Sequence, residues 1–80
     1  MDYYLGGIIL LPYNFSLMYW MPCEGQILQV AQNQALFSLI GYNYGGNGTT
    51  TFALPDLRNA SPLPGMRYCI ATQGYYPPRS

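Results

Sequence analysis

Six side chains of the 80-residue chain carry a formal charge, and they are the first candidates for chemistry. They are Asp2, Glu24, Asp56, Arg58, Arg67 and Arg79. The chain has no histidine and no lysine, so it lacks the commonest general base and the residue that forms Schiff bases. Two cysteines without histidine cannot complete a four-ligand zinc site unless a second chain contributes ligands. We therefore expect a protein that is not an enzyme, with no catalytic residue, no cofactor and no metal.

Asp56 and Arg58 are the charged pair with the most suggestive spacing. Residues two apart in an extended segment lie on the same face, so these side chains either hold a ligand together or bind each other. In a chain so poor in charge we favour a structural role over ligand binding, in which Asp56 accepts N–H groups of the loop and Arg58 donates to carbonyls. Glu24, followed by Gly25, is typical of a carboxylate in a turn.

A glycine-rich stretch, residues 41–48, invites comparison with loops that bind phosphate. Such a loop needs a lysine, then serine or threonine, and a helix after it. This stretch contains no lysine and leads into threonines and Phe52, which favour a strand. We predict a structural turn in which Gly45, Gly46 or Gly48 adopts positive φ.

Cys23 and Cys69 leave two interpretations open. They form a disulfide that closes a long loop, or they are small buried apolar residues. Three sequons make Asn14, Asn47 and Asn59 candidate glycosylation sites.

Glycosylation requires a route out of the cytoplasm, and the N-terminus has no recognisable signal peptide. Its first charge is acidic and its apolar run, residues 8–11, is short. We also expect no membrane insertion. We expect an extracellular or virion-tail location. The protein would reach it by lysis or by a dedicated export route, or the sequence has already been processed.

Charged residues make up 8% of the chain, against about 25% in a typical soluble domain, and the net charge is zero. Zero net charge argues against nucleic acid as a partner. Uncharged polar groups or other copies of the chain must cover the surface, so we expect a homo-oligomer or fibre. Tyrosine, used nine times, favours interfaces. The candidate interface residues are Tyr3, Tyr4, Tyr75 and Tyr76. Tyrosine rings also stack on sugars, which makes surface glycans the alternative partner.

The hydrophobic pattern predicts a small α+β fold, with one helix packed on short strands, in a single domain spanning residues 1–80. The helix is expected over residues 30–40, with Gln32 or Asn33 as a later start and Gly41 as its terminator. Extended segments are expected at residues 6–11, 19–21, 26–28, 49–53 and 67–72. The helix face, Trp20, Phe52 and Leu54 are expected to form the core.

The order of motifs resembles that of the phage tail collar domain family, which includes small bacterial proteins labelled microcystin-dependent proteins. The matching segments are Gly7-Ile8-Ile9-Leu10, Trp20, Pro22-Cys23-Glu24-Gly25-Gln26, Ala35-Leu36-Phe37-Ser38-Leu39-Ile40-Gly41, Tyr44-Gly45-Gly46-Asn47-Gly48, Thr50-Thr51-Phe52-Ala53-Leu54-Pro55-Asp56-Leu57-Arg58 and Tyr68-Cys69-Ile70-Ala71-Thr72-Gln73-Gly74 with Pro78-Arg79. They cover nearly the whole chain, and the segment from Tyr44 to Arg58 is the most specific.

The resemblance implies a compact structural module of tail fibres that associates with itself, typically as a trimer. The family usually continues after Asp-Leu-Arg with Gly-Arg and a long variable insertion, often with histidines. Here residues 59–61 lead almost directly to Met66. Receptor-facing and metal-binding features of that insertion are therefore not carried over to this short form. We expect a non-enzymatic structural subunit, with a carbohydrate-binding adhesin or receptor-binding module as the alternative.

Overall fold

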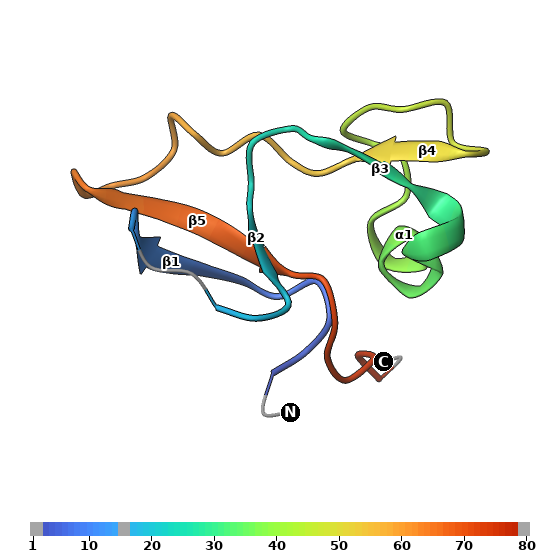
Figure 1. The fold of residues 1–80 in the computed structure, drawn as a ribbon, viewed down its shortest axis with the longest axis horizontal. Helices are drawn as coiled ribbons and strands as arrows, with labels where there is room; N and C mark the ends of the chain where they lie inside the picture. Colours follow the sequence, from blue (N-terminus) through green and yellow to red (C-terminus); the bar gives the residue numbers. More distant parts are fainter. Residues whose placement is uncertain (1–2, 15–16, 79–80) are drawn as a thin grey trace.

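The computed structural model describes residues 3–14 and 17–78, and it shows two small antiparallel sheets and one helix (Figure 1). The elements are β1 (Ile8–Pro12), β2 (Trp20–Pro22), β3 (Ile27–Gln29), the 3-10 helix η1 (Val30–Gln32), α1 (Gln34–Ile40), β4 (Thr51–Ala53) and β5 (Met66–Ala71). This arrangement confirms the α+β prediction. Within the described residues no helix has the length and apolarity needed to cross a bilayer.

The last strand, β5, lies in the middle of the larger sheet, whose order is β1-β5-β2. Both neighbours run antiparallel to it, and Ile70 pairs with Ile8 on one side and Met21 on the other. In the smaller sheet β3 pairs with β4, with Leu28 opposite Phe52. Each sheet therefore joins segments that are distant in the sequence. The larger sheet is complete only when β5, near the end of the chain, lies between β1 and β2.

The predicted helix is interrupted at Asn33, where the backbone leaves helical geometry (φ −141°, ψ 40°). The Asn33 side chain donates to the carbonyl of Gln29 across 3.0 Å, which holds η1 as a separate turn. Helix α1 begins at Gln34, close to the later start considered from the sequence. Gly41 ends α1 as predicted, with a φ of 63° and an N–H that donates to Phe37 O at 2.7 Å.

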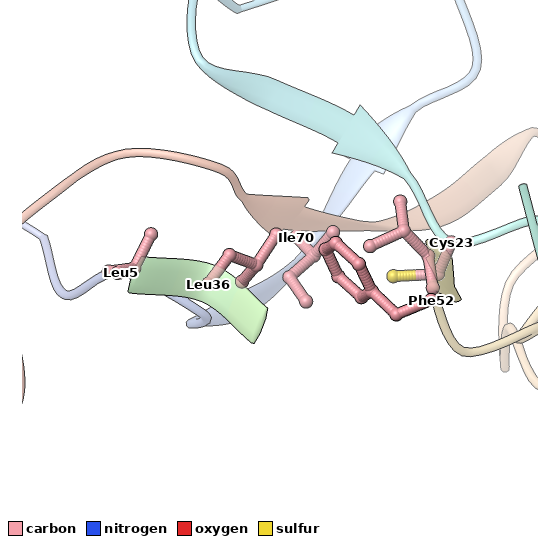
Figure 2. Packing of buried hydrophobic residues seen from close by; sticks show 6 residues of the cluster. Leu5, Cys23, Leu36, Phe52 and Ile70 are labelled. Atoms are coloured by element: carbon pink, nitrogen blue, oxygen red, sulfur yellow. The ribbon is translucent and has the colours of Figure 1, made fainter. Parts of the chain in front are cut away.

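One apolar cluster joins both sheets to α1 (Figure 2). Its buried members are Leu5, Cys23, Leu36, Phe52, Leu54 and Ile70. Phe52 and Leu54 are 0% exposed, which confirms them as core residues. The Phe52 ring also packs against Phe37, with ring centroids 5.3 Å apart. Cluster members come from residue 5 to residue 70, so the core forms only when the whole chain is assembled.

Trp20 is not a core residue, contrary to our prediction. It is half-buried, and its ring lies against Tyr3 with centroids 5.0 Å apart. The register sets the face on which it lies: Trp20 pairs with Ala71, whereas Met21 pairs with Ile70 of the apolar cluster. Because side chains alternate between sheet faces, Trp20 is on the face opposite the apolar cluster.

Tyr19 does not continue the extended segment, although it was expected to. Its φ is 68°, and it is the one described non-glycine residue with a positive φ. Its carbonyl accepts both the backbone N–H and the hydroxyl of Thr72, at 2.7 and 2.9 Å. These two bonds hold the left-handed backbone that turns the chain into β2.

The structure does not contain the disulfide considered from the sequence, since Cys23 and Cys69 are both free and buried. Cys69 pairs with Pro22, and the next residue, Cys23, donates its N–H to Tyr68 O at 3.0 Å. Alternation along the strands places the two thiols on opposite faces of the sheet. They are therefore small buried apolar residues, the other interpretation left open above.

Burial, and secondly the neighbouring Cys69, raises the pKa of the Cys23 thiol to about 11. We predict that native Cys23 does not react with a disulfide reagent at pH 8 and reacts fully once urea unfolds the chain. The variant Cys69→Ala isolates the response of Cys23. Because the folded pKa is raised, the associated stability is present below the ordinary thiol pKa and is lost as pH rises through about 11. Rapid labelling of the native thiol would contradict the packing described here.

Candidate functional site

The motif segment from Cys23 to Gln26 is joined by backbone hydrogen bonds to the segment that leaves β4. Leu54 N donates to Gln26 O at 3.0 Å and Leu57 N donates to Cys23 O at 2.8 Å. Between them, the N–H of residue 25 reaches Pro55 O at 3.3 Å. The structure therefore brings together two of the motifs that the sequence analysis selected, at the border between the two sheets.

Gly25 and Gln26 shape the turn that makes this junction possible. Gly25 has a φ of +76°, and a Cβ there would lie 3.4 Å from the Asp56 Cβ. The Gln26 amide donates to Pro22 O at 2.8 Å, and its oxygen accepts from Glu24 N at 3.0 Å. The Gln26 side chain therefore closes the turn by one donated and one accepted hydrogen bond.

Asp56 and Arg58 bind each other, so the Arg58 side chain donates to a carboxylate and not to the carbonyls that we predicted, whereas Asp56 accepts a loop N–H as expected. Arg58 Nε donates to Asp56 Oδ1 at 2.9 Å and Nη2 donates to Oδ2 at 2.7 Å. The Arg58 backbone N–H adds a third bond to Oδ1 at 3.2 Å. The side chains are 57% and 47% exposed, so the pair lies in solvent and neutralises itself. An exposed pair of this kind contributes little to folding stability.

Hydrogen bonds from Arg58 hold the pKa of the Asp56 carboxyl at about 2. We predict that Asp56 titrates near this value by carbon-detected NMR, and that Arg58→Gln returns its pKa toward the ordinary value of about 3.9. Arg67→Gln is the control and leaves Asp56 unchanged. Because the folded pKa is lowered, any stability it contributes is present above the ordinary carboxyl pKa and is lost as pH falls through about 2. An ordinary Asp56 pKa in the wild-type chain would show that the bidentate pair does not form.

Asn47 organises the glycine-rich loop, a role that the sequence analysis missed. Its Oδ1 accepts the backbone N–H groups of Thr49, Thr50 and Thr51 at 2.7, 2.8 and 3.1 Å. Its Nδ2 donates to Thr50 Oγ1 at 3.0 Å. A phosphate-binding loop needs free N–H groups, and here they are used within the loop. Asparagine before glycine and threonine is the sequence signal that could have indicated this turn.

Gly46 brings the loop backbone directly onto the backbone of β4. It has a φ of +87°, and a Cβ there would lie 2.5 Å from Phe52 Cα and 2.6 Å from Thr51 O. Gly45 O accepts the N–H of Ala53 at 3.1 Å, which fixes the loop along the strand. The contact between two backbones requires glycine, because any side chain would separate the loop from β4.

We predict that Gly46→Ala lowers the free energy of unfolding by about 2–5 kcal/mol, through left-handed backbone strain and overpacking. Gly65→Ala is the matched control, because Gly65 has a similar φ of +77° but no atom within 4 Å of the place that a Cβ would take. It therefore carries the strain alone, about 1–2 kcal/mol. Urea unfolding measures both values. Equal losses for the two variants would mean that the close backbone contact does not matter.

The candidate glycosylation sites differ in their surroundings, and glycosylation remains a prediction at each. Asn14 and Asn59 are exposed in turns, although the sequon of Asn14 continues into residues 15–16, which lie outside the described residues. Asn47 is exposed too, but its amide is already bonded within the glycine loop. Of the charged residues, Asp2 and Arg79 also lie outside the described residues.

The four candidate interface tyrosines lie in one region, where the N-terminal segment, residues 3–5, and the C-terminal segment, residues 74–78, run side by side. Tyr75 N donates to Tyr3 O at 3.0 Å, and Tyr4 forms a bridge with Tyr75. The Tyr76 hydroxyl is 2.7 Å from the Ser38 hydroxyl on α1. Tyr4, Tyr75 and Tyr76 are exposed, while Tyr3 is half-buried against Trp20. We call these four residues the tyrosine patch.

A hollow of about 250 Å³ lies beside the tyrosine patch. It is lined by Leu5, Gln32, Asn33, Gln34, Ala35, Leu36, Thr72, Gln73 and Gly74. Its polar groups are uncharged amides and a hydroxyl, which suit a neutral polar ligand. In the described part of the chain no three His, Cys, Asp or Glu side chains come together as a metal site would require.

A protein-family model described as the phage tail collar domain matches residues 6–62. The match covers β1 to β4, the glycine loop and the Asp56–Arg58 turn, which is most of the chain. It confirms the resemblance inferred from the motifs. No curated protein and no solved structure gave a match.

Proposed function

The chain belongs to the phage tail collar domain family, and on that premise we propose that it is a structural subunit of phage-tail-fibre type that associates with itself. The proposed assembly is a trimer, fibre or filament outside the cell or on a virion tail. The family is a structural one, and the proposed role of the chain involves no catalysis. Glycosylation, where it occurs, adds solvation to a surface that is poor in charge.

The size of the exposed surface supports association. The chain exposes 5399 Å², whereas a monomer of its 9.0 kDa mass exposes about 4,900 Å². Its radius of gyration, 12.6 Å, also exceeds the roughly 11.6 Å of a compact domain of this length. The excess surface is available to contact neighbouring copies.

The chemistry of that surface is the observation that carries the proposal. The exposed large apolar side chains include Ile8, Ile9, Leu17, Met18, Met21, Ile27 and Leu63, in addition to the exposed tyrosines. In the described residues the Asp56–Arg58 pair neutralises itself, which leaves few charges to solvate the remainder. Burial of apolar area yields about 25 cal/mol per Å², so contact between copies is favourable.

The tyrosine patch supplies a first contact surface. Tyr4 and Tyr75 present large rings with polar tips, and their backbones are already fixed by hydrogen bonds to each other's segments. Because the rings are held on paired segments, ordering them in an interface costs little further entropy.

We predict that light scattering finds the wild-type chain as particles heavier than 9.0 kDa. The double variant Tyr4→Ser/Tyr75→Ser is expected to weaken association at least tenfold, because both exposed rings are lost while the backbone is kept. Tyr42→Ser/Tyr44→Ser, which removes two exposed rings from the glycine loop, is the control and keeps wild-type association. Equal effects of the two double variants would contradict a specific role of the patch.

The hollow beside the tyrosine patch favours carbohydrate binding as a second candidate function. The amides that line it are suited to hydroxyl-rich neutral sugars, and two of its lining residues, Leu5 and Gly74, are the chain neighbours of Tyr4 and Tyr75. Saturable binding to a glycan array, lost on Gln73→Ala or Tyr75→Ser and kept on Tyr42→Ser, would establish the adhesin instead. If none of the glycans binds, the structural subunit remains the proposed function.

A further inference from the structure

The four outer strand edges of the two sheets differ in whether their backbone groups already have partners. In an antiparallel pair, alternate residues bond to the neighbour and the residues between them direct N–H and C=O outward. The outward groups of each edge strand can therefore be identified from the register. They decide where another strand can add.

The edge of β2 is closed. Its outward residues are Trp20 and Pro22, since Tyr19 O and Cys23 N bond to β5 and its extension. Trp20 N donates within its own turn, to Leu17 O at 3.2 Å. Pro22 has no N–H, and its carbonyl accepts the Gln26 amide at 2.8 Å. No outward donor is left on this edge.

The edge of β4 is closed by the glycine loop. Its outward residues are Thr51 and Ala53. Thr51 N donates to Asn47 Oδ1 at 3.1 Å, and Thr51 O accepts from Gly48 N at 2.9 Å. Ala53 N donates to Gly45 O at 3.1 Å. The loop therefore occupies the place of a neighbouring strand.

The edge of β1 is open. Ala71 N donates to Gly7 O at 2.9 Å and Tyr13 N donates to Gly65 O at 2.8 Å, so odd-numbered residues face β5. Ile8 and Leu10 direct their N–H groups outward, where the described residues offer no acceptor.

The edge of β3 is open in the same way. Val30 N donates to Thr50 O at 2.9 Å and Leu54 N donates to Gln26 O at 3.0 Å, so even-numbered residues face β4. Ile27 and Gln29 direct their N–H groups outward, and no acceptor for them lies in the described part of the chain.

We propose that the β1 edge of one copy pairs antiparallel with the β3 edge of a second copy. Placing Ile8 opposite Gln29 and Leu10 opposite Ile27 lets all four outward N–H groups donate to a carbonyl. The Gln29 carbonyl, which accepts from Asn33, has a second lone pair for this bond. The inference rests on the proposed self-association and specifies the surface that produces it.

The position of the two open edges favours this pairing over pairing of β1 with itself. The two open edges belong to different sheets and lie toward opposite ends of the long axis (Figure 1), which suits head-to-tail contact. Each presents two donors with the same spacing, and neither strand carries a charged residue that would repel a neighbour. A head-to-tail contact closes into a ring or continues as a filament. Ile8 and Ile27, which are 44% and 58% exposed, would then be covered.

The test uses one proline on each open edge of the full chain, Leu10→Pro and Ile27→Pro. Each removes an outward N–H that the domain does not use, so circular dichroism is expected to show both variants folded. We expect each variant alone to associate at least tenfold more weakly than wild type. An equimolar mixture is expected to form a one-to-one heterodimer by native mass spectrometry, because each variant keeps the edge that the other has lost.

The other results of this experiment contradict different parts of the proposal. If Ile27→Pro associates like wild type while Leu10→Pro does not, β1 pairs with itself and the proposed partner edge is wrong. If neither variant weakens association, the edges are not the contact, although self-association stands. A wild-type chain that stays monomeric contradicts the proposed function itself.

If a proline variant fails to fold, amide hydrogen exchange on the wild-type chain tests whether the two strand edges pair. The N–H groups of Ile8, Leu10, Ile27 and Gln29 are expected to exchange fast in dilute solution and slowly in the assembled state. Fast exchange of these amides in the assembled state would refute the pairing.

Discussion

The contact between the backbone of Gly46 and the backbone of β4 is the constraint on which the arrangement of this small protein depends. A Cβ at Gly46 would lie 2.5 Å from Phe52 Cα, so the loop can approach only as glycine. The approach lets Asn47 and Gly45 bond the outer side of β4. Phe52, the residue that Gly46 approaches, lies with Leu54 in the core that joins the sheets to α1. One edge of the smaller sheet is thereby closed, and the other edge, on β3, remains available.

Scarcity of charge is the second constraint on how this protein binds a partner. The turn that leaves β4 carries the one ion pair in the described residues, Asp56–Arg58, and its members satisfy each other in solvent. Backbone groups, tyrosine hydroxyls and amides must then provide nearly all polar recognition. Such groups favour contacts through strand edges and aromatic patches over steering by long-range fields. A structural subunit that binds its own copies is consistent with this distribution of groups.

Local patterns predicted the parts of the fold that depend on local chemistry. The glycine after Ile40 ends α1, the 41–48 stretch forms a turn, and Phe52 and Leu54 are buried, all as expected from sequence. The family was also identifiable, because Tyr44 to Arg58 is a contiguous and specific motif. The spacing of Asp56 and Arg58 indicated that the two side chains could pair, but it did not show that Arg58 would bind Asp56 in place of backbone carbonyls.

Features that depend on register could not be predicted in this way. Which face Trp20 occupies follows from its pairing with Ala71, a residue far away in sequence. The free state of Cys23 and Cys69 follows from the same register, and composition alone left it open. The organising role of Asn47 depends on three consecutive N–H groups converging on one oxygen.

Sedimentation velocity of the wild-type chain over a concentration series tests the central claim most directly, because it measures the mass of the particle without labels or surfaces. The account predicts a boundary that moves faster as concentration rises, toward a multiple of 9.0 kDa. A single unglycosylated 9.0 kDa boundary at every concentration would contradict it.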